Sequence, residues 1–152
     1  MADVTFRTVA EPRRGGGIRI HLPVDPAAAW GDRDKWYVHG TIEGRPFRGS
    51  FEGVDGETVL DLGPSWCRDP EVGPGHDVTV VVRLEGPQLD TIDPTFADAL
   101  RAEPAARRTF ESLASFYRKD FADWVGSAKK AETRERRIAE SVALLKDGRT
   151  RS

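Results

Sequence analysis

A group of basic residues near the C-terminal end of the chain has the types and spacing that could bind an anion. Lys129 and Lys130 are followed by Arg134 and Arg137, which lie three positions apart and therefore share one face of a helix. Two guanidinium groups on one face can meet a single carboxylate or phosphate group. Trp124 precedes them and offers an aromatic floor beside the cations. These five residues are the candidate binding site for an anionic ligand or an acidic partner.

Structural roles compete with this binding hypothesis. A run of charges is commonly a solvated helix face, and glutamates at i, i+4 spacing neutralise part of this one. The pair Arg134 and Arg137 could instead pin its helix to acidic residues such as Asp120 or Asp123 on the preceding helix. Trp124 could equally be a core residue, because it lies in register with apolar neighbours.

Two amphipathic helices must position these residues. The apolar residues with helical spacing are Phe121, Trp124, Val125 and Ala128 in the first helix, and Ile138, Val142 and Leu145 in the second. The polar segment KKAET predicts a joint near residues 129–133, so the second helix would begin near Thr133 and expose free N–H groups there. Gly148 predicts the end of the second helix, with Lys146 in its last turn.

Two earlier helices are indicated by proline at the first helical position. Asp93 and Pro94 predict an N-cap and first turn, followed by an apolar face with Phe96, Ala99 and Leu100. Pro104 predicts the start of another helix, along which Phe110, Leu113 and Tyr117 repeat. Neither helix can bury its apolar face alone, so we expect the two to pack on one another, with packing against the barrel as a further option.

The C-terminal stretch RKDFADWVGSAKKAETRERRIAESVALLKDG resembles the signature of the YdeI/OmpD-associated (bacteriocin-protection) family. Members carry an aromatic, tryptophan-containing helix, an AK pair, and then a TR-x-x-R helix that ends in glycine. The matching residues are Tyr117, Phe121, Trp124, Ala128, Lys129, Thr133, Arg134, Arg137, Ile138 and Gly148. The resemblance implies a role in tolerance of membrane-active antibacterial peptides, and it implies no known reaction.

The first half of the chain reads as short β-strands at hairpin spacing. Strands are expected at residues 4–9, 18–22, 36–42, 59–62 and 78–84, and in a return strand with Phe47 and Phe51. The first two are expected to form a hairpin through the Gly-rich turn at 13–17. Asp25 and Pro26 predict one short helix through Trp30. Residues 64–75 are expected to form a loop that holds Trp66 and Cys67.

Six short strands and one small helix predict a closed or nearly closed β-barrel, because closure removes exposed strand edges. The fold class is therefore α+β, mainly β, with a barrel over residues 3–86 and a helical segment over 92–147. The stretches HGTIEGRPFRGSF and G-x-G-x-D-V-x-V-x-V resemble the small domain of unknown function that is often fused ahead of YdeI-like segments. This resemblance implies a double-split β-barrel, a fold shared with DNA-binding regulator and antitoxin domains. The family follows its last long strand with an acidic residue and an arginine, whereas this chain has no arginine at 85–90.

Composition and charge limit the classes of function that the protein can have. The net charge of −2 divides unevenly: residues 1–90 hold 10 Lys and Arg against 15 Asp and Glu, and residues 91–152 hold 13 against 10. Wrapping nucleic acid needs a concentrated positive surface, which only the C-terminal part could offer. A single cysteine and no apolar run long enough for a signal peptide or membrane span predict a soluble, cytoplasmic bacterial protein.

Side chains for metal or covalent chemistry are sparse. His21, His39 and His76 lie in separate segments without ligand spacing, so no metal and no cofactor is expected. Cys67 would need a base and a lowered pKa to act as a nucleophile, so a buried or incidental thiol is the better interpretation. His39 lies opposite the apolar face of its strand and could point to solvent or into the barrel.

Three hypotheses for function remain. The first is a non-enzymatic protein of stress or antibacterial-peptide tolerance that binds a partner or anionic ligand through its C-terminal helices. The second is nucleic-acid binding, motivated by the barrel resemblance and opposed by the negative charge of that half. The third is an enzyme of a kind that the sequence does not identify.

Overall fold

The computed structural model describes residues 3–68 and 72–151, and the chain divides into two compact units. The first unit is Met1–Leu84, and the second is Glu85–Ser152. Each unit has its own apolar cluster: one cluster is drawn from positions 4–84 and the other from positions 89–145. The units are therefore described one after the other.

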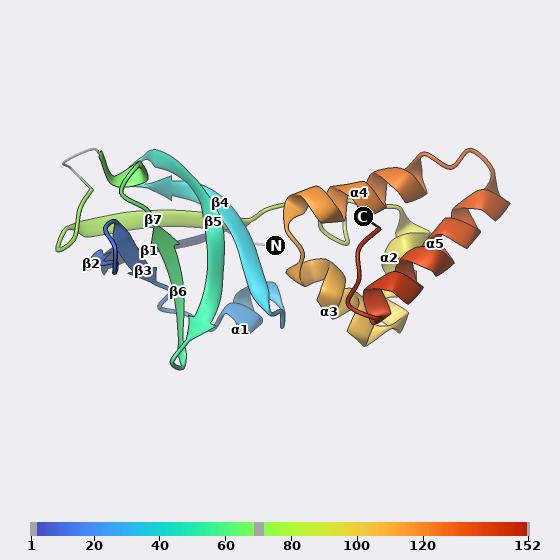
Figure 1. Ribbon diagram of the computed structural model, residues 1–152, viewed down its shortest axis with the longest axis horizontal. Coiled ribbons are helices and arrows are strands. Elements are labelled where there is room, and N and C mark those ends of the chain that lie inside the picture. Colours follow the sequence, from blue (N-terminus) through green and yellow to red (C-terminus); the bar gives the residue numbers. More distant parts are fainter. Residues whose placement is uncertain (1–2, 69–71, 152) are drawn as a thin grey trace. The chain divides into compact units, whose positions relative to one another are not determined.

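The first unit is a strongly curled antiparallel sheet of seven strands (Figure 1). The strands are β1 (Val4–Val9), β2 (Glu11–Pro12), β3 (Ile18–His21), β4 (Lys35–Ile42), β5 (Arg45–Val54), β6 (Glu57–Leu62) and β7 (Asp77–Leu84). Their order across the sheet is β1-β7-β4-β5-β6-β3-β2, so β1 and β2 lie at the two ends. The sheet forms a half-barrel, and together with the helices that follow it confirms the predicted α+β class.

Alternation along each strand explains how the sheet buries one face. In β7, Val78, Val80 and Val82 are fully buried, as their period of two predicts. In β3, Ile18 and Ile20 are buried in the same way. The same apolar cluster includes the buried aromatic residues Trp30, Trp36, Phe47 and Phe51.

The predicted hairpin between residues 4–9 and 18–22 is wrong. β1 pairs with β7, in register from Val4 opposite Val82 to Val9 opposite Asp77. The backbone of Ala10 extends this pairing by donating to the His76 carbonyl and accepting from the Gly75 amide. The chain then crosses to the other end of the sheet, where the two-residue strand β2 pairs with β3. Sequence periodicity fixes which residues form strands but not which strands are neighbours.

Helix α1 (Pro26–Trp30) and the loop after β6 complete the first unit. Asp25 caps α1 as predicted, because its carboxylate accepts a hydrogen bond from the Ala27 amide. Trp66–Arg68 form a 3-10 turn within the expected loop at 64–75. Part of that predicted loop, residues 69–71, lies outside the described residues.

The second unit is built from α2 (Pro94–Ala102), α3 (Pro104–Ser112), α4 (Ser115–Gly126) and α5 (Ala131–Lys146). Asp93 caps α2 as predicted, accepting from the Thr95 and Phe96 amides. The core of the unit holds the fully buried residues Phe96, Leu100, Phe110, Phe121, Val125 and Leu145. Phe96 and Phe110 meet edge to face, with ring centroids 5.8 Å apart, so α2 and α3 pack on one another as expected.

Two helix boundaries differ from the sequence prediction. The helix that starts at Pro104 ends at Ser112, because Leu113 is extended and its carbonyl accepts from the buried Arg118 guanidinium at 3.0 Å. Tyr117 therefore belongs to α4 and is exposed. The joint predicted at 129–133 lies slightly earlier, since α4 ends at Gly126 and α5 begins at residue 131. The end of α5 is as predicted, with a positive φ of 73° at Gly148.

None of the helices formed by the described residues is long and apolar enough to span a membrane.

Independent folding of the two parts stays a prediction, with the barrel expected over residues 3–86 and the helical segment over 92–147. We expect a fragment that ends at Gly86 to fold, because the apolar cluster of the first unit uses no residue beyond Leu84. Circular dichroism should then show β-structure and a cooperative thermal transition. An unfolded fragment would mean that the two parts depend on one shared core.

Candidate functional site

The four basic residues predicted to bind an anion lie where α4 passes into α5. We call this group, Lys129, Lys130, Arg134 and Arg137, the cationic corner. The two lysines sit in the connection between the helices, and the two arginines lie one turn apart on α5. All four belong to the second unit.

Arg137 binds the C-terminal end of α4. Its Nη1 atom donates to the Trp124 carbonyl at 2.8 Å and to the Ser127 hydroxyl at 3.1 Å. The last carbonyls of a helix have no partner within the helix and carry the negative end of its dipole. A guanidinium group satisfies both needs, so Arg137 acts as a cap for α4.

Arg134 binds the same connection one turn earlier. Its Nη2 atom donates to the Ala128 carbonyl at 2.8 Å, and its Nε atom lies 3.9 Å from the Asp93 carboxylate. That Nε atom is buried and makes no hydrogen bond to any described residue. Arg134 therefore links the α4–α5 connection to the start of α2, with one donor left unused.

Trp124 is half-buried and lies between two arginines. The Arg137 guanidinium is 5.2 Å from the centre of its ring, and the Arg151 guanidinium is 4.1 Å away. The same Arg151 donates to the Asp120 carboxylate at 2.9 Å. The Trp124 ring thus lies against two cations, which agrees with the aromatic floor and not with a core position. Both cations are side chains of the protein itself.

The acidic partners proposed for the two arginines are occupied by other residues. Asp120 pairs with Arg151, and the Asp123 carboxylate lies 3.6 Å from the Lys119 ammonium group. The arginines do pin their helix to the preceding one, as the structural alternative holds, but chiefly through backbone carbonyls. Sequence reasoning cannot find these acceptors, because every residue carries a carbonyl.

Lys129 and Lys130 differ from the arginines. Both side chains are exposed, and neither makes an ion pair or hydrogen bond within residues 3–68 and 72–151. Lys130 is the N-cap residue of α5, and no side chain caps that helix. The amides of the first turn therefore have no side-chain cap at the positive end of the helix dipole.

The residues selected from the sequence therefore do lie together, but the sequence does not distinguish those that make internal contacts from those that are exposed. Arg137 contacts Trp124 on α4 and Arg134 contacts the connection at Ala128, whereas the two lysines have no partner among the described residues. Sequence reasoning missed Arg151, Ser127 and Asp93, which complete the arginine contacts. The only available signal was the basic character of the tail after Gly148.

Other chemistry finds little support among the described residues. Burial raises the pKa of the Cys67 thiol, which outweighs the opposite effects of a hydrogen bond at Ile18 and of the Arg45 charge. A raised pKa disfavours the reactive thiolate. His39 lies opposite Arg48 and Arg83 in the sheet register, on the face away from the buried Val38. No group of three His, Cys, Asp or Glu side chains in the described part of the chain could hold a metal ion.

The arginine contacts predict a loss of stability when both arginines are replaced. Arg134→Gln with Arg137→Gln should lower the melting temperature by several degrees, because a hydrogen bond from a charged donor contributes about 1.5–3 kcal/mol. Differential scanning calorimetry measures the change.

Arg136→Gln is the matched control on the same helix. Its exposed side chain pairs only loosely with Glu140, at 3.9 Å, so the melting temperature should stay within about a degree. Equal losses in the double variant and the control would remove the capping role from Arg134 and Arg137.

Trp124 should contribute less to stability than its core neighbour. Trp124→Ala should cost about 1–3 kcal/mol, because the half-buried ring loses two cation contacts and only part of its packing. Phe121→Ala on the same helix should cost about 3–5 kcal/mol, since that side chain is fully buried. Urea unfolding of both variants compares them, and a larger loss for Trp124 would place it in the core.

Comparisons with known proteins divide the chain at nearly the same place as the structure does. Residues 6–82 match the model of a domain of unknown function (DUF1905), which covers the curled sheet. Residues 91–148 match the model OmdA, described as bacteriocin-protection, YdeI or OmpD-associated, which covers α2 to α5. No curated protein that was compared matches the chain. Both resemblances recognised in the sequence are thereby confirmed.

Proposed function

The chain belongs to the DUF1905 family and continues into a bacteriocin-protection, YdeI or OmpD-associated segment, and from this premise we propose a function in binding. The protein acts, in this proposal, as a non-enzymatic cytoplasmic component of stress or antibacterial-peptide tolerance. It binds an anionic ligand or an acidic partner protein through the cationic corner.

One observation carries the proposal: Lys129 and Lys130 are exposed and have no partner within the described residues, directly before an uncapped helix. Two ammonium groups and the free amides of the first turn all favour an anion at this place. The neighbouring Glu132 reduces but does not cancel this charge, since it is one carboxylate against two lysines.

The cationic corner thus has two kinds of members. Arg134 and Arg137 hold the α4–α5 connection in place through the carbonyls that they bind. The lysines and the α5 amides form the surface that a ligand would touch. In this proposal the arginines preorganise the site, and a rigid site loses less conformational entropy when a ligand binds.

Replacing the two lysines tests the proposal. Lys129→Gln with Lys130→Gln should weaken binding of an acidic probe, such as a labelled hexaglutamate peptide, by about fivefold to tenfold. The melting temperature should not change, because neither side chain has a partner to lose within the described residues. Fluorescence anisotropy measures binding, and calorimetry measures stability.

The double variant Lys35→Gln with Lys146→Gln is the control for total charge. Both lysines are exposed and paired with glutamates elsewhere, at 3.4 and 3.3 Å. The control also removes two positive charges, at other positions, and should leave probe binding unchanged. If both double variants weaken binding equally, the effect belongs to net charge and the cationic corner has no special role.

Two further probes separate the competing functions. Duplex DNA should bind weakly, because residues 1–90 carry a net charge of −5 and oppose phosphate contacts. Tight DNA binding that falls steeply with salt would replace the proposal with nucleic-acid recognition. Turnover of a metabolite in an activity screen would replace it with catalysis.

A further inference from the structure

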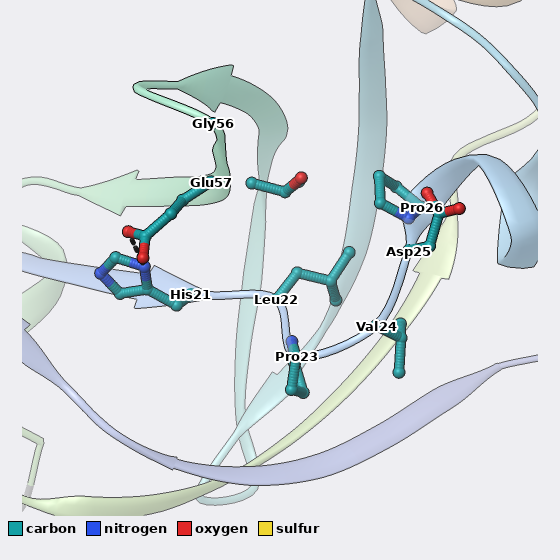
Figure 2. A pocket seen from close by; sticks show the side chains of 9 residues that line it. His21, Leu22, Pro23, Val24, Asp25, Pro26, Gly56 and Glu57 are labelled. Carbon is teal, nitrogen blue, oxygen red and sulfur yellow. Dashed lines mark ion pairs between the residues drawn. The ribbon is translucent and has the colours of Figure 1, made fainter.

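A polar cavity of about 350 Å³ lies in the first unit, between the segment after β3 and the turn that connects β5 to β6. Figure 2 shows His21 and Glu57 meeting at one end of it and Asp25 at the other, with Leu22 between them. Its volume is at the small end of the range for ligand sites, so it suits a single side chain or a small molecule.

The cavity combines an apolar wall with acidic ends. Leu22 and the unusually exposed Val24, 43% accessible, supply aliphatic surface. Asp25 caps α1 through its Oδ1 atom, and its Oδ2 atom takes no part in the cap. Glu57 contributes the second carboxylate, and no lysine or arginine is among the described residues that line the cavity.

His21 already shows which kind of group Glu57 accepts. Its Nδ1 atom lies 3.0 Å from the Glu57 carboxylate, and its Nε2 atom lies 2.7 Å from the Glu11 carboxylate. A neutral imidazole has one N–H group, so only the imidazolium cation can donate to both carboxylates at once. Because the two carboxylates lie on opposite ring nitrogens, they hold a proton-carrying ring and do not converge on a metal ion.

We propose that this cavity binds a primary alkylammonium group, with its cationic head at the Glu57 carboxylate and its aliphatic stem along Leu22 and Val24 toward Asp25. The ligand chemistry matches a free aliphatic amine and equally a lysine side chain of a peptide. An apolar stem beside a charged head is the pattern in which such groups bury themselves. The proposal concerns the first unit and does not depend on the cationic corner.

The His21 ring shares the Glu57 carboxylate with the proposed ligand. The charged groups that act on this ring include Glu11 on β2 and Glu57 and Asp61 on β6. Arg19 is engaged with Asp61 through two hydrogen bonds of 2.7 and 3.0 Å, so neither is available to the ligand. The imidazolium competes with an ammonium head for Glu57.

Nuclear magnetic resonance titration of the full chain tests the proposal with n-butylammonium and with an acetylated, amidated Gly-Lys-Gly peptide. Amide shifts at Leu22, Gly56 and Thr58 should saturate, with n-butanol as the uncharged control that does not bind. Glu57→Gln should weaken binding about threefold to fivefold, the range for a partly exposed ion pair. Binding of n-butylammonium but not of the peptide assigns the site to free amines, and the reverse assigns it to lysine side chains.

Two more variants complete the test. Glu52→Gln removes an exposed carboxylate that is paired with Lys35 outside the cavity, and it should leave binding unchanged. His21→Gln removes the ring that shares the Glu57 carboxylate, and it should strengthen binding of n-butylammonium. The proposal is overturned if neither ammonium probe shifts these amides, or if Glu57→Gln and Glu52→Gln behave alike.

Discussion

The connection between α4 and α5 depends on satisfying the carbonyls at the end of α4. A helix that stops leaves several acceptors without partners, and Arg137 on α5 donates to one of them, the Trp124 carbonyl. This bond joins a cation to the negative end of the α4 dipole, and Arg134 adds a second bond to the Ala128 carbonyl in the connection that follows. The same two bonds fix the direction in which α5 leaves the connection, and with it the face that brings Ile138 and Leu145 into the core.

The difference between arginine and lysine explains why one basic segment serves two purposes. Arg137 uses a single guanidinium to reach a carbonyl, a hydroxyl and a ring face, which a planar group with several donors permits. Lysine presents a compact, strongly hydrated charge, and it loses much side-chain freedom when it is fixed. Arginines in the helix are therefore suited to internal contacts, whereas exposed lysines keep their hydration and remain available. The run of cations looks uniform in the sequence, but its arginines and lysines differ in the groups that they can bind.

Periodicity predicted most of the elements, since burial alternates along strands such as β7 and follows the helical period in α5. The caps at Asp25 and Asp93 were also predictable, because capping is local chemistry. Strand pairing was not: β1 lies beside β7, which is far along the chain, and nothing local in residues 4–9 specifies that neighbour. The early end of α3 could not be predicted either, because it depends on a contact outside the helix. The Leu113 carbonyl is taken by Arg118, and a single buried arginine contact outweighs a helical pattern that continues through Tyr117.

The candidate sites follow the same division between local and distant information. The cationic corner could be found from the sequence because its members are close in the chain, although their backbone acceptors could not. The cavity beside His21 could not be found, because Glu11, His21 and Glu57 come from three strands that only the fold brings together. A histidine with a carboxylate at each ring nitrogen looks like an isolated residue in the sequence. Its carboxylate partners can be recognised only after β2, β3 and β6 are placed side by side, because Glu11 and Glu57 are diagonal neighbours of His21 across the strand pairs.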